Sequence, residues 1–344
     1  MNYDIDVKKT RINCFRQSKV AGEFMLQLRV PGSLIDAKHL TMVQEVAQKW
    51  GNGTFHVGMR QTLNIPGIKY QYIPEVNKYI KEYIETEVEG CGVDMEINDA
   101  GYPTIGSRNI MACIGNSHCI KANVNTHQLA KKIEKLVFPS HYHIKLSVAG
   151  CPNDCGKAQF NDFGVIGVAR MEYHADRCIG CGGCVKACEH HATRVLSLNS
   201  QGKIDKDYCC CVGCGECVLV CPTSAWTRSP KKYYRVMIGG RSGKQYPRMG
   251  KMFLNWASEE TVLQVFDNWQ KFSAWVMNNK PEYIHGGHLI DRAGYHKFKE
   301  LILDGVDLNP ECLVAEEIYW AESEQRANIH LKPLSKHKVA GPKA

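Results

Sequence analysis

The chain has 344 residues, of which 44% are hydrophobic and 23% charged, so we expect a globular protein with room for two domains. It contains no apolar run long enough to cross a bilayer, and acidic residues stand where a signal peptide would be basic, which predicts a cytoplasmic protein without a membrane span. The net charge of +8 comes without a basic stripe interleaved with aromatic residues, which argues against a nucleic-acid partner and suits an anionic cofactor or an acidic redox partner.

The first 75 residues have the pattern of a small α+β module. Residues 24–30 alternate as a strand does and end at Pro31-Gly32. Apolar residues at helical spacing follow, and Gly51 and Gly53 close that helix. The expected elements are a strand at 24–30, a helix at 37–50, strands at 54–57 and 62–65, and a helix at 73–87.

Residues 76–172 and 231–330 are expected to form one α/β domain that is interrupted by a small inserted module at 173–230. The apolar strand 163–169 precedes the interruption, and the strand 233–238 follows it. Ser258 is placed to cap a helix whose first turn carries Glu259 and Glu260. Residues 331–344 have the composition of a basic, poorly ordered tail.

The inserted module holds ten of the chain's 17 cysteines, most of them two or three residues apart. Such clusters favour metal ligation over disulfides, which are rare in a reducing cytosol. The run that starts at Cys178 recurs at Cys211, 33 positions later (211 minus 178). Two runs of this spacing are typical of a bacterial-type ferredoxin with two [4Fe-4S] clusters, in which the fourth cysteine of each run ligates the other cluster. The predicted ligand sets are Cys178, Cys181, Cys184 and Cys221, and Cys188, Cys211, Cys214 and Cys217.

A zinc ribbon would need two pairs of ligands rather than two quartets. Cys209 and Cys210 are spare thiols beside the second run, but only Cys211 keeps the required spacing. Outside the module, Cys113-x5-Cys119 and Cys151-x3-Cys155 predict a third cluster.

The sequence around these last cysteines resembles the siroheme-dependent sulfite and nitrite reductase family. The resemblance rests on the segment from Gly150 to Gly156, on the Cys-x5-Cys and Cys-x3-Cys pairs, and on Met59-Arg60-Gln61, and it extends over nearly the whole chain. It implies a ferredoxin-like N-terminal sulfite reductase module, an α/β siroheme/[4Fe-4S] domain, and a siroheme. In this family the last cysteine of the Cys-x3-Cys pair, here Cys155, bridges the cluster to the siroheme iron.

The same resemblance implies the residues of an anion site. Siroheme is a polycarboxylate and sulfite is a dianion, so guanidinium and ammonium groups must surround them. The implied sulfite ligands are Arg60, Arg108 and Lys145, with His143 at a position where the family commonly has lysine. Gln61 and Asn153 match positions beside the macrocycle, and the Gly-rich segment after the module offers cations for the siroheme carboxylates: Arg241, Lys244 and Arg248.

The implied reaction is the reduction of sulfite to hydrogen sulfide with six electrons, which the two ferredoxin clusters would deliver. Enzymes of this family usually contain two copies of the siroheme half, whereas this chain has one set of motifs, so we expect a homo-oligomer or a heteromeric complex. No Gly-rich dinucleotide fingerprint precedes a helix, so NADH oxidation would belong to flavin- and ferredoxin-bearing electron-donor subunits.

Three alternatives remain open at this point. Nitrite reduction would use the same machinery, and a non-catalytic polyferredoxin would hold the two ferredoxin clusters without a siroheme. A redox-sensing nucleic-acid binder is the third, although the sequence offers no motif for it.

Overall fold

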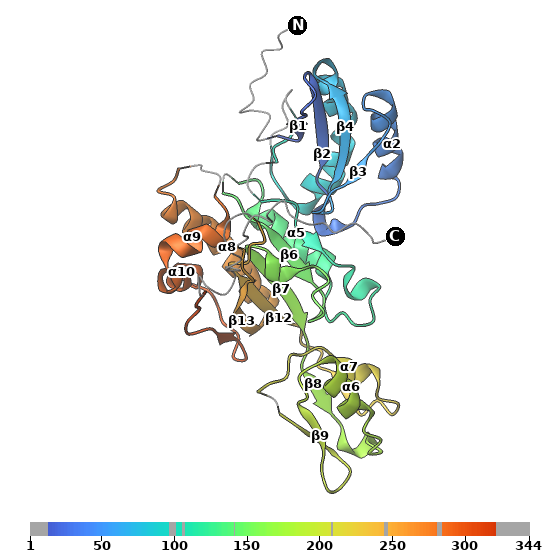
Figure 1. Cartoon of the computed structure of the whole chain (residues 1–344), viewed down its shortest axis with the longest axis vertical. Coiled ribbons are helices and arrows are strands. Elements are labelled where there is room, and N and C mark those ends of the chain that lie inside the picture. Colours follow the sequence, from blue (N-terminus) through green and yellow to red (C-terminus); the bar gives the residue numbers. More distant parts are fainter. Residues whose placement is uncertain are drawn as a thin grey trace, which may run out of the picture.

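The computed structural model describes residues 13–95, 101–104, 107–140, 142–207, 209–243, 247–280 and 284–320. Lys244 and the expected tail at 331–344 lie outside these residues. The described residues form three regions along the long axis of the molecule: an N-terminal module, a central domain around a large sheet, and a small module at the opposite end (Figure 1).

The N-terminal module is a four-stranded antiparallel sheet in the order β1-β2-β4-β3, covered by helices. Every second residue of β2 is buried, as a half-covered strand requires. The side chains of Phe24, Leu26 and Leu28 pack with Val43 and Val46 of α2 in one core. Its elements are β1 (Phe15–Gln17), β2 (Glu23–Leu28), α2 (His39–Lys49), β3 (His56–Val57), β4 (Leu63–Lys69), α3 (Ile73–Tyr79) and α4 (Lys81–Tyr83).

The central domain is built on a six-stranded mixed sheet in the order β14-β13-β12-β7-β6-β5. β5, β6 and β7 are parallel neighbours, and β7, β12, β13 and β14 pair antiparallel. All residues of β6 and β7 are buried, as expected for strands in the middle of a covered sheet. The strands are β5 (Met111–Ala112), β6 (Leu146–Ala149), β7 (Phe163–Val168), β12 (Tyr233–Ile238), β13 (Lys251–Ala257) and β14 (Leu313–Val314).

Four helices pack their apolar faces on this sheet: α5 (Thr126–Val137), α8 (Glu259–Val276), α9 (Gly286–Ala293) and α10 (Tyr295–Ile302). Phe163 of β7 lies at the centre of their core, with its ring 5.3 Å from Phe266 and 5.0 Å from Trp269 of α8. The expected cap of α8 is confirmed, because the Ser258 side chain accepts a hydrogen bond from the Thr261 N–H at 3.1 Å.

A small module of residues 171–228 interrupts the central sheet between two neighbouring strands. β7 and β12 pair with Val168 opposite Tyr233, and the pairing continues into the module with Met171 opposite Arg228. The module is therefore carried on a two-stranded ribbon that extends from the sheet (Figure 1). Its elements are β8 (Met171–Tyr173), α6 (Gly183–His191), β9 (Leu196–Leu198), β10 (Ile204–Lys206), α7 (Glu216–Leu219) and β11 (Trp226–Arg228).

The helix expected at 73–87 is not continuous. It consists of α3, the short α4, and a π-helical segment, Ile84–Val88. Ile80, Tyr83, Ile84 and Val88 are all buried, and the wider π turn keeps Ile84 and Val88 on the buried face. The fold class is mixed α and β, as expected.

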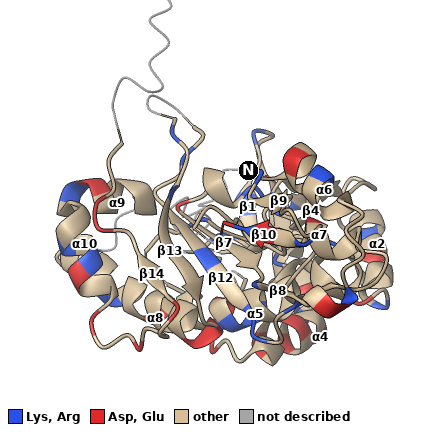
Figure 2. Ribbon diagram, turned by 90° about the horizontal axis from the view of Figure 1, so that it is seen from below, with Lys and Arg blue, Asp and Glu red and all other residues tan. Residues whose placement is uncertain are grey.

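Basic and acidic side chains are interspersed over the helices of the molecule, for example along α9 and α10 (Figure 2). Among the described residues, no helix combines the length and the apolar character that crossing a membrane requires.

Candidate active site

The four cysteines outside the module converge at the carboxyl ends of two parallel strands. Cys113 follows β5 and Cys151 follows β6, and Ala112 lies opposite Val148 in the pairing of these strands. The Sγ of Cys113 accepts a hydrogen bond from the Gly150 N–H at 3.1 Å. Burial raises the pKa of Cys151, and the thiols of Cys119, Cys113 and Cys155 add to the effect because all four lie close together. Converging sulfur atoms with an N–H···S contact fit a [4Fe-4S] cluster.

The module gathers its cysteines in two groups of four. One small cavity is lined by Cys178, Cys181, Cys184 and Cys221. Another is lined by Cys188, Cys211, Cys214 and Cys217. Each group contains the fourth cysteine of the other run, which is the crosswise grouping that the spacing predicts. Both groups fit the ligand chemistry of a cubane cluster.

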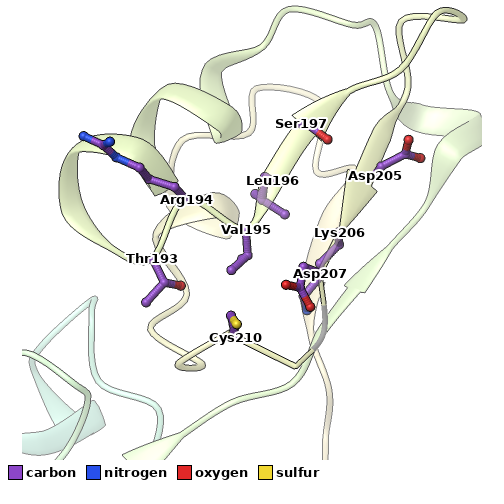
Figure 3. Close-up of a pocket in the computed structure, with 9 residues that line it drawn as sticks. All are labelled: Thr193, Arg194, Val195, Leu196, Ser197, Asp205, Lys206, Asp207 and Cys210. Atoms are coloured by element: carbon purple, nitrogen blue, oxygen red, sulfur yellow. The ribbon is translucent and has the colours of Figure 1, made fainter.

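A wider hollow of about 520 Å³ lies beside β9 and β10, outside both groups of cysteines (Figure 3). The spare thiol of Cys210 lines it, next to Asp207. The charge of Asp207 raises the pKa of Cys210, which makes its thiolate harder to form. Cys210 lines neither of the two small cavities that gather the cysteines, whereas Cys211 lines one of them.

Asn123 joins the module to the cysteines of the central domain. Its side-chain amide donates to Gly213 O at 3.2 Å, between Cys211 and Cys214, and to Gly167 O of β7 at 3.3 Å. Its backbone N–H donates to Gly150 O at 2.7 Å, beside Cys151. A salt bridge of 2.8 Å between Lys121 and Glu216 supports the same contact. The group that contains Cys214 is therefore the one that adjoins the central cysteines.

Arg60 lies in the turn between β3 and β4 and reaches across to the central sheet. Its guanidinium donates to Asn109 O at 3.0 Å, to the Asn161 side chain at 2.9 Å and to Leu146 O at 2.5 Å. Burial lowers the pKa of Arg60 to about 10, and the charge of Asp162 opposes this. The group stays cationic near neutral pH, and it has more N–H donors than these three contacts use.

Arg108, His143 and Lys145 lie around Arg60, at the amino ends of β5 and β6. Burial lowers the pKa of Lys145, and the positive charges of Arg60 and Arg108 lower it further. Burial lowers the pKa of His143 to about 3, and the charges of Arg108 and Lys145 act in the same direction. The structure thus brings together all four residues expected to bind and protonate the anion, and a bound anion would relieve the repulsion among Arg60, Arg108 and Lys145.

Two residues of this site were missed by the sequence analysis, Asp162 and His285. Asp162 is buried just before β7 and accepts from the Lys145 N–H at 2.8 Å and from the Gly287 N–H at 3.2 Å. His285 comes before α9, and its ring lies 4.5 Å from that of His143. A lone aspartate and a lone histidine carry no motif, so only the fold could reveal them.

Gln61 is exposed and hydrogen-bonds to the strand that leads into the cysteine site. Its side chain donates to Ala112 O at 3.0 Å and accepts from Ala112 N–H at 2.9 Å, directly before Cys113. Arg60 and Gln61 are consecutive, so one turn contacts both the cationic group and the cysteine group. Asn153 and Cys155 are exposed in the loop after β6.

Arg241 and Arg248, expected to bind siroheme carboxylates, both form salt bridges with Asp291 of α9, at 2.9 Å and 2.7 Å. Arg248 also lies over the ring of Trp320, 4.0 Å from its centroid. The protein itself thus supplies a carboxylate to both arginines. A cofactor carboxylate would have to share them with Asp291 or displace it.

Two protein families match the chain. The family described as "Nitrite and sulphite reductase 4Fe-4S domain" matches residues 105–308, and that described as "Nitrite/Sulfite reductase ferredoxin-like half domain" matches residues 16–83. Among curated proteins, a subunit of the anaerobic sulfite reductase of Salmonella typhimurium is 52% identical over 335 residues, which cover 97% of this chain and 99% of the relative.

More distant relatives share only part of their length with the chain. The coenzyme F420-dependent sulfite reductase of Methanocaldococcus jannaschii is 31% identical over 200 residues, 56% of this chain and 30% of that protein. Among solved structures, dissimilatory sulfite reductase I superposes with a TM-score of 0.63 at 17% identity, over 87% of this chain and 72% of that one. This last likeness supports the fold.

Proposed function

The chain belongs to the nitrite and sulfite reductase family, and from that premise we propose that it is the siroheme-bearing catalytic subunit of a sulfite reductase. One observation carries the proposal: the turn of Arg60 and Gln61 connects a group of cations, suited to an anionic substrate, to a group of four cysteines, suited to a [4Fe-4S] cluster. The proposed reaction joins sulfite, six electrons and seven protons to give hydrosulfide and three waters.

The cysteines at 113, 119, 151 and 155 would hold the cluster of the central domain, with Cys155 shared with the siroheme iron. Siroheme, when bound, supplies an iron that ligates sulfur and passes electrons to it. Arg241 and Arg248 remain candidates for its carboxylates, as does Lys244. Gln61 would hold the strand that leads into Cys113.

The protein's own chemistry is to bind the anion and to protonate it. Arg60 and Arg108 would hold the sulfite oxygens through charge-assisted hydrogen bonds. Lys145 and His143 would deliver protons to the departing oxygens. The lowered pKa of Lys145 favours proton release from its ammonium group.

Two further [4Fe-4S] clusters in the module would bring the electrons, for a total of three clusters per chain. The ligand set that contains Cys214 adjoins Asn123, so we place its cluster nearer to the siroheme. The set that contains Cys178 would then face the electron donor. We assign that role to flavin- and ferredoxin-bearing partner subunits in the cytoplasm.

The test is an anaerobic visible spectrum and an iron count of the purified protein, with sulfide measured after adding sulfite and reduced methyl viologen. We expect tetrapyrrole bands that shift with sulfite, and iron near thirteen atoms per chain, counting about four for each cubane. Cys155→Ala should abolish sulfide formation, whereas Cys209→Ala, which removes a spare thiol, should not.

Iron near eight atoms per chain without tetrapyrrole bands would contradict the proposal and favour a polyferredoxin. Faster turnover of nitrite than of sulfite would favour the nitrite reductase alternative.

A further inference from the structure

Three residues from distant parts of the chain meet behind the proposed sulfite site. His143 precedes β6, Asp162 precedes β7 and His285 precedes α9. One nitrogen or oxygen atom from each lies within 4.8 Å of the others. The rings of His143 and His285 meet edge to face, with an interplanar angle of 83°.

The solvent exposure of the three residues rises from the interior toward α9. His143 and Asp162 are each only 1% exposed, whereas the side chain of His285 is 34% exposed. The group therefore connects solvent at α9 with a buried imidazole beside the anion-binding cations. This arrangement matters because the proposed reaction consumes seven protons.

We propose that His285 and Asp162 form the proton entry route to His143: His285 takes protons from solvent, and Asp162 holds the two imidazoles in line. The inference deepens the proposed function and rests on it. Asp162 is a positioning residue, because it acts through the two histidines and not on the substrate.

The contacts of Asp162 explain how it can hold this position. One carboxylate oxygen accepts from the Lys145 N–H and the other from the Gly287 N–H, so the carboxylate is fixed between β6 and the start of α9. The close approach needs a glycine at 286, where an added Cβ would lie 2.9 Å from Trp269 and 3.1 Å from the Cβ of Asp162.

Electrostatics keep the Asp162 carboxylate charged. Burial alone would raise the pKa of Asp162, but the hydrogen bond and charge of His285, with the charge of His143, lower it overall. A buried carboxylate that stays ionised stabilises a proton on either neighbouring imidazole while that proton passes. The His285 Nδ1 lies 3.9 Å from an oxygen of Asp162.

A divalent metal ion suits the same three residues less well. Both oxygens of Asp162 already accept backbone hydrogen bonds, and cations surround the group on two sides. The charged and titratable neighbours are Arg60, Arg108 and Lys145 on the sheet side, and His288 and Arg248 on the α9 side. A transient single charge is repelled less by these groups than a permanent double charge.

Each transfer is a proton movement without oxidation or reduction. As His285 gives a proton to one nitrogen of His143, the N–H bond at the other nitrogen of His143 breaks and an O–H bond forms on a departing sulfite oxygen, so the imidazole of His143 stays neutral. His285 is then reprotonated by solvent. The six electrons come separately, from the donor of the proposed reaction.

The experiment measures proton uptake by the complete enzyme in a weakly buffered solution with a pH indicator dye. Sulfite and reduced methyl viologen start the reaction in a stopped-flow cell, and viologen oxidation is recorded in parallel. We expect His285→Gln to slow proton uptake and sulfide formation roughly 100-fold, at the lower end of a general-acid contribution. Added imidazole should restore part of the rate. Asp162→Asn should slow both processes as well.

The matched control is His296→Gln, which removes an exposed histidine of α10 from the same C-terminal segment and should keep the wild-type rate. Because the side chain of residue 285 is partly exposed, we expect His285→Gln to fold. This variant therefore keeps the test valid if Asp162→Asn does not fold. Wild-type proton uptake in His285→Gln, with normal siroheme and cluster spectra, would overturn the route but leave the proposed function standing. Stoichiometric Co²⁺ binding that His285→Gln abolishes would overturn it in favour of a metal site.

Discussion

Two buried charges, Arg29 and Glu134, join the N-terminal module to helix α5. The Arg29 Nε donates to the Glu134 carboxylate, and both residues are almost fully buried. Arg29 also donates to Ser107 O at 2.8 Å and to Ser107 Oγ at 2.9 Å, and its guanidinium lies over the ring of Phe138. Such a pair is costly to break, because removing one partner leaves the other charge buried without compensation.

We therefore predict that Glu134→Gln lowers the free energy of unfolding by roughly 3 kcal/mol. The measurement is the shift of the urea unfolding midpoint, followed by far-UV circular dichroism. Glu300→Gln serves as the control, since it breaks an exposed pair with Lys297 and should cost less than about 0.5 kcal/mol. Equal shifts for the two variants would show that the buried pair has no special role.

The buried imidazole of His143 predicts a pH dependence of stability. Its pKa in the folded protein, about 3, lies below the ordinary value of 6.5, so below pH 6.5 the unfolded chain binds the proton more readily. Stability should therefore fall as the pH falls from 6.5 toward 3, with a loss from this group of roughly 1 kcal/mol at pH 5.5. Unfolding midpoints at pH 7.5 and 5.5 measure it. His143→Gln should reduce the difference, and an unchanged difference would refute the assignment.

At the scale of elements, the ribbon that carries the inserted module predicts that the module can be removed. The Ser229 N–H donates to Arg170 O at 2.8 Å, so the two strands are already hydrogen-bonded where they leave the sheet. Residues 171–228 could therefore be replaced by Asn-Gly, which favours a tight turn between antiparallel strands.

We expect this shortened chain to fold and keep its siroheme, because β7 and β12 remain paired. Cluster iron should fall from about twelve to about four atoms per chain. Reduction of sulfite by the natural donor should be lost, while a small viologen reductant should still support it. Loss of siroheme from a folded shortened chain would contradict this prediction.

The sequence predicted those elements whose signal is local. The strand expected at 233–238 is confirmed as β12, and the helix expected at 37–50 corresponds to α2. The crosswise grouping of the cysteines also follows from their spacing, since in a bacterial-type ferredoxin the fourth cysteine of each run ligates the other cluster. Short strands such as β1 and β14 have two or three residues, too few for alternation to be detected.

The order of strands and the position of Asp162 could not be predicted in this way. Asp162 meets Lys145 because β6 and β7 are adjacent, and it meets Gly287 because α9 packs over the same sheet end. The second contact spans 125 residues of sequence, and no local pattern reports it. Resemblance to a family supplied Arg60 and Arg108, which a single sequence would otherwise leave among its many surface arginines.

At the scale of the whole molecule, the inserted module, the central sheet and the N-terminal module follow one another along the long axis (Figure 1). The Arg60 turn belongs to the N-terminal module, so its placement over the central sheet depends on how the two parts pack. The strand before this turn, β3, forms the edge of its sheet. Val57 and Met59, two residues apart beside that edge, are 64% and 91% exposed.

An exposed sheet edge with apolar side chains, next to the turn proposed to bind sulfite, is suited to pairing with another chain. We predict that the protein assembles through this edge, and that Val57→Lys produces a smaller particle in size-exclusion chromatography with light scattering. Leu313→Lys is the control, because Leu313 is 60% exposed at the edge of the six-stranded sheet and should leave the size unchanged. A strictly monomeric wild-type protein with siroheme and full activity would refute this assembly.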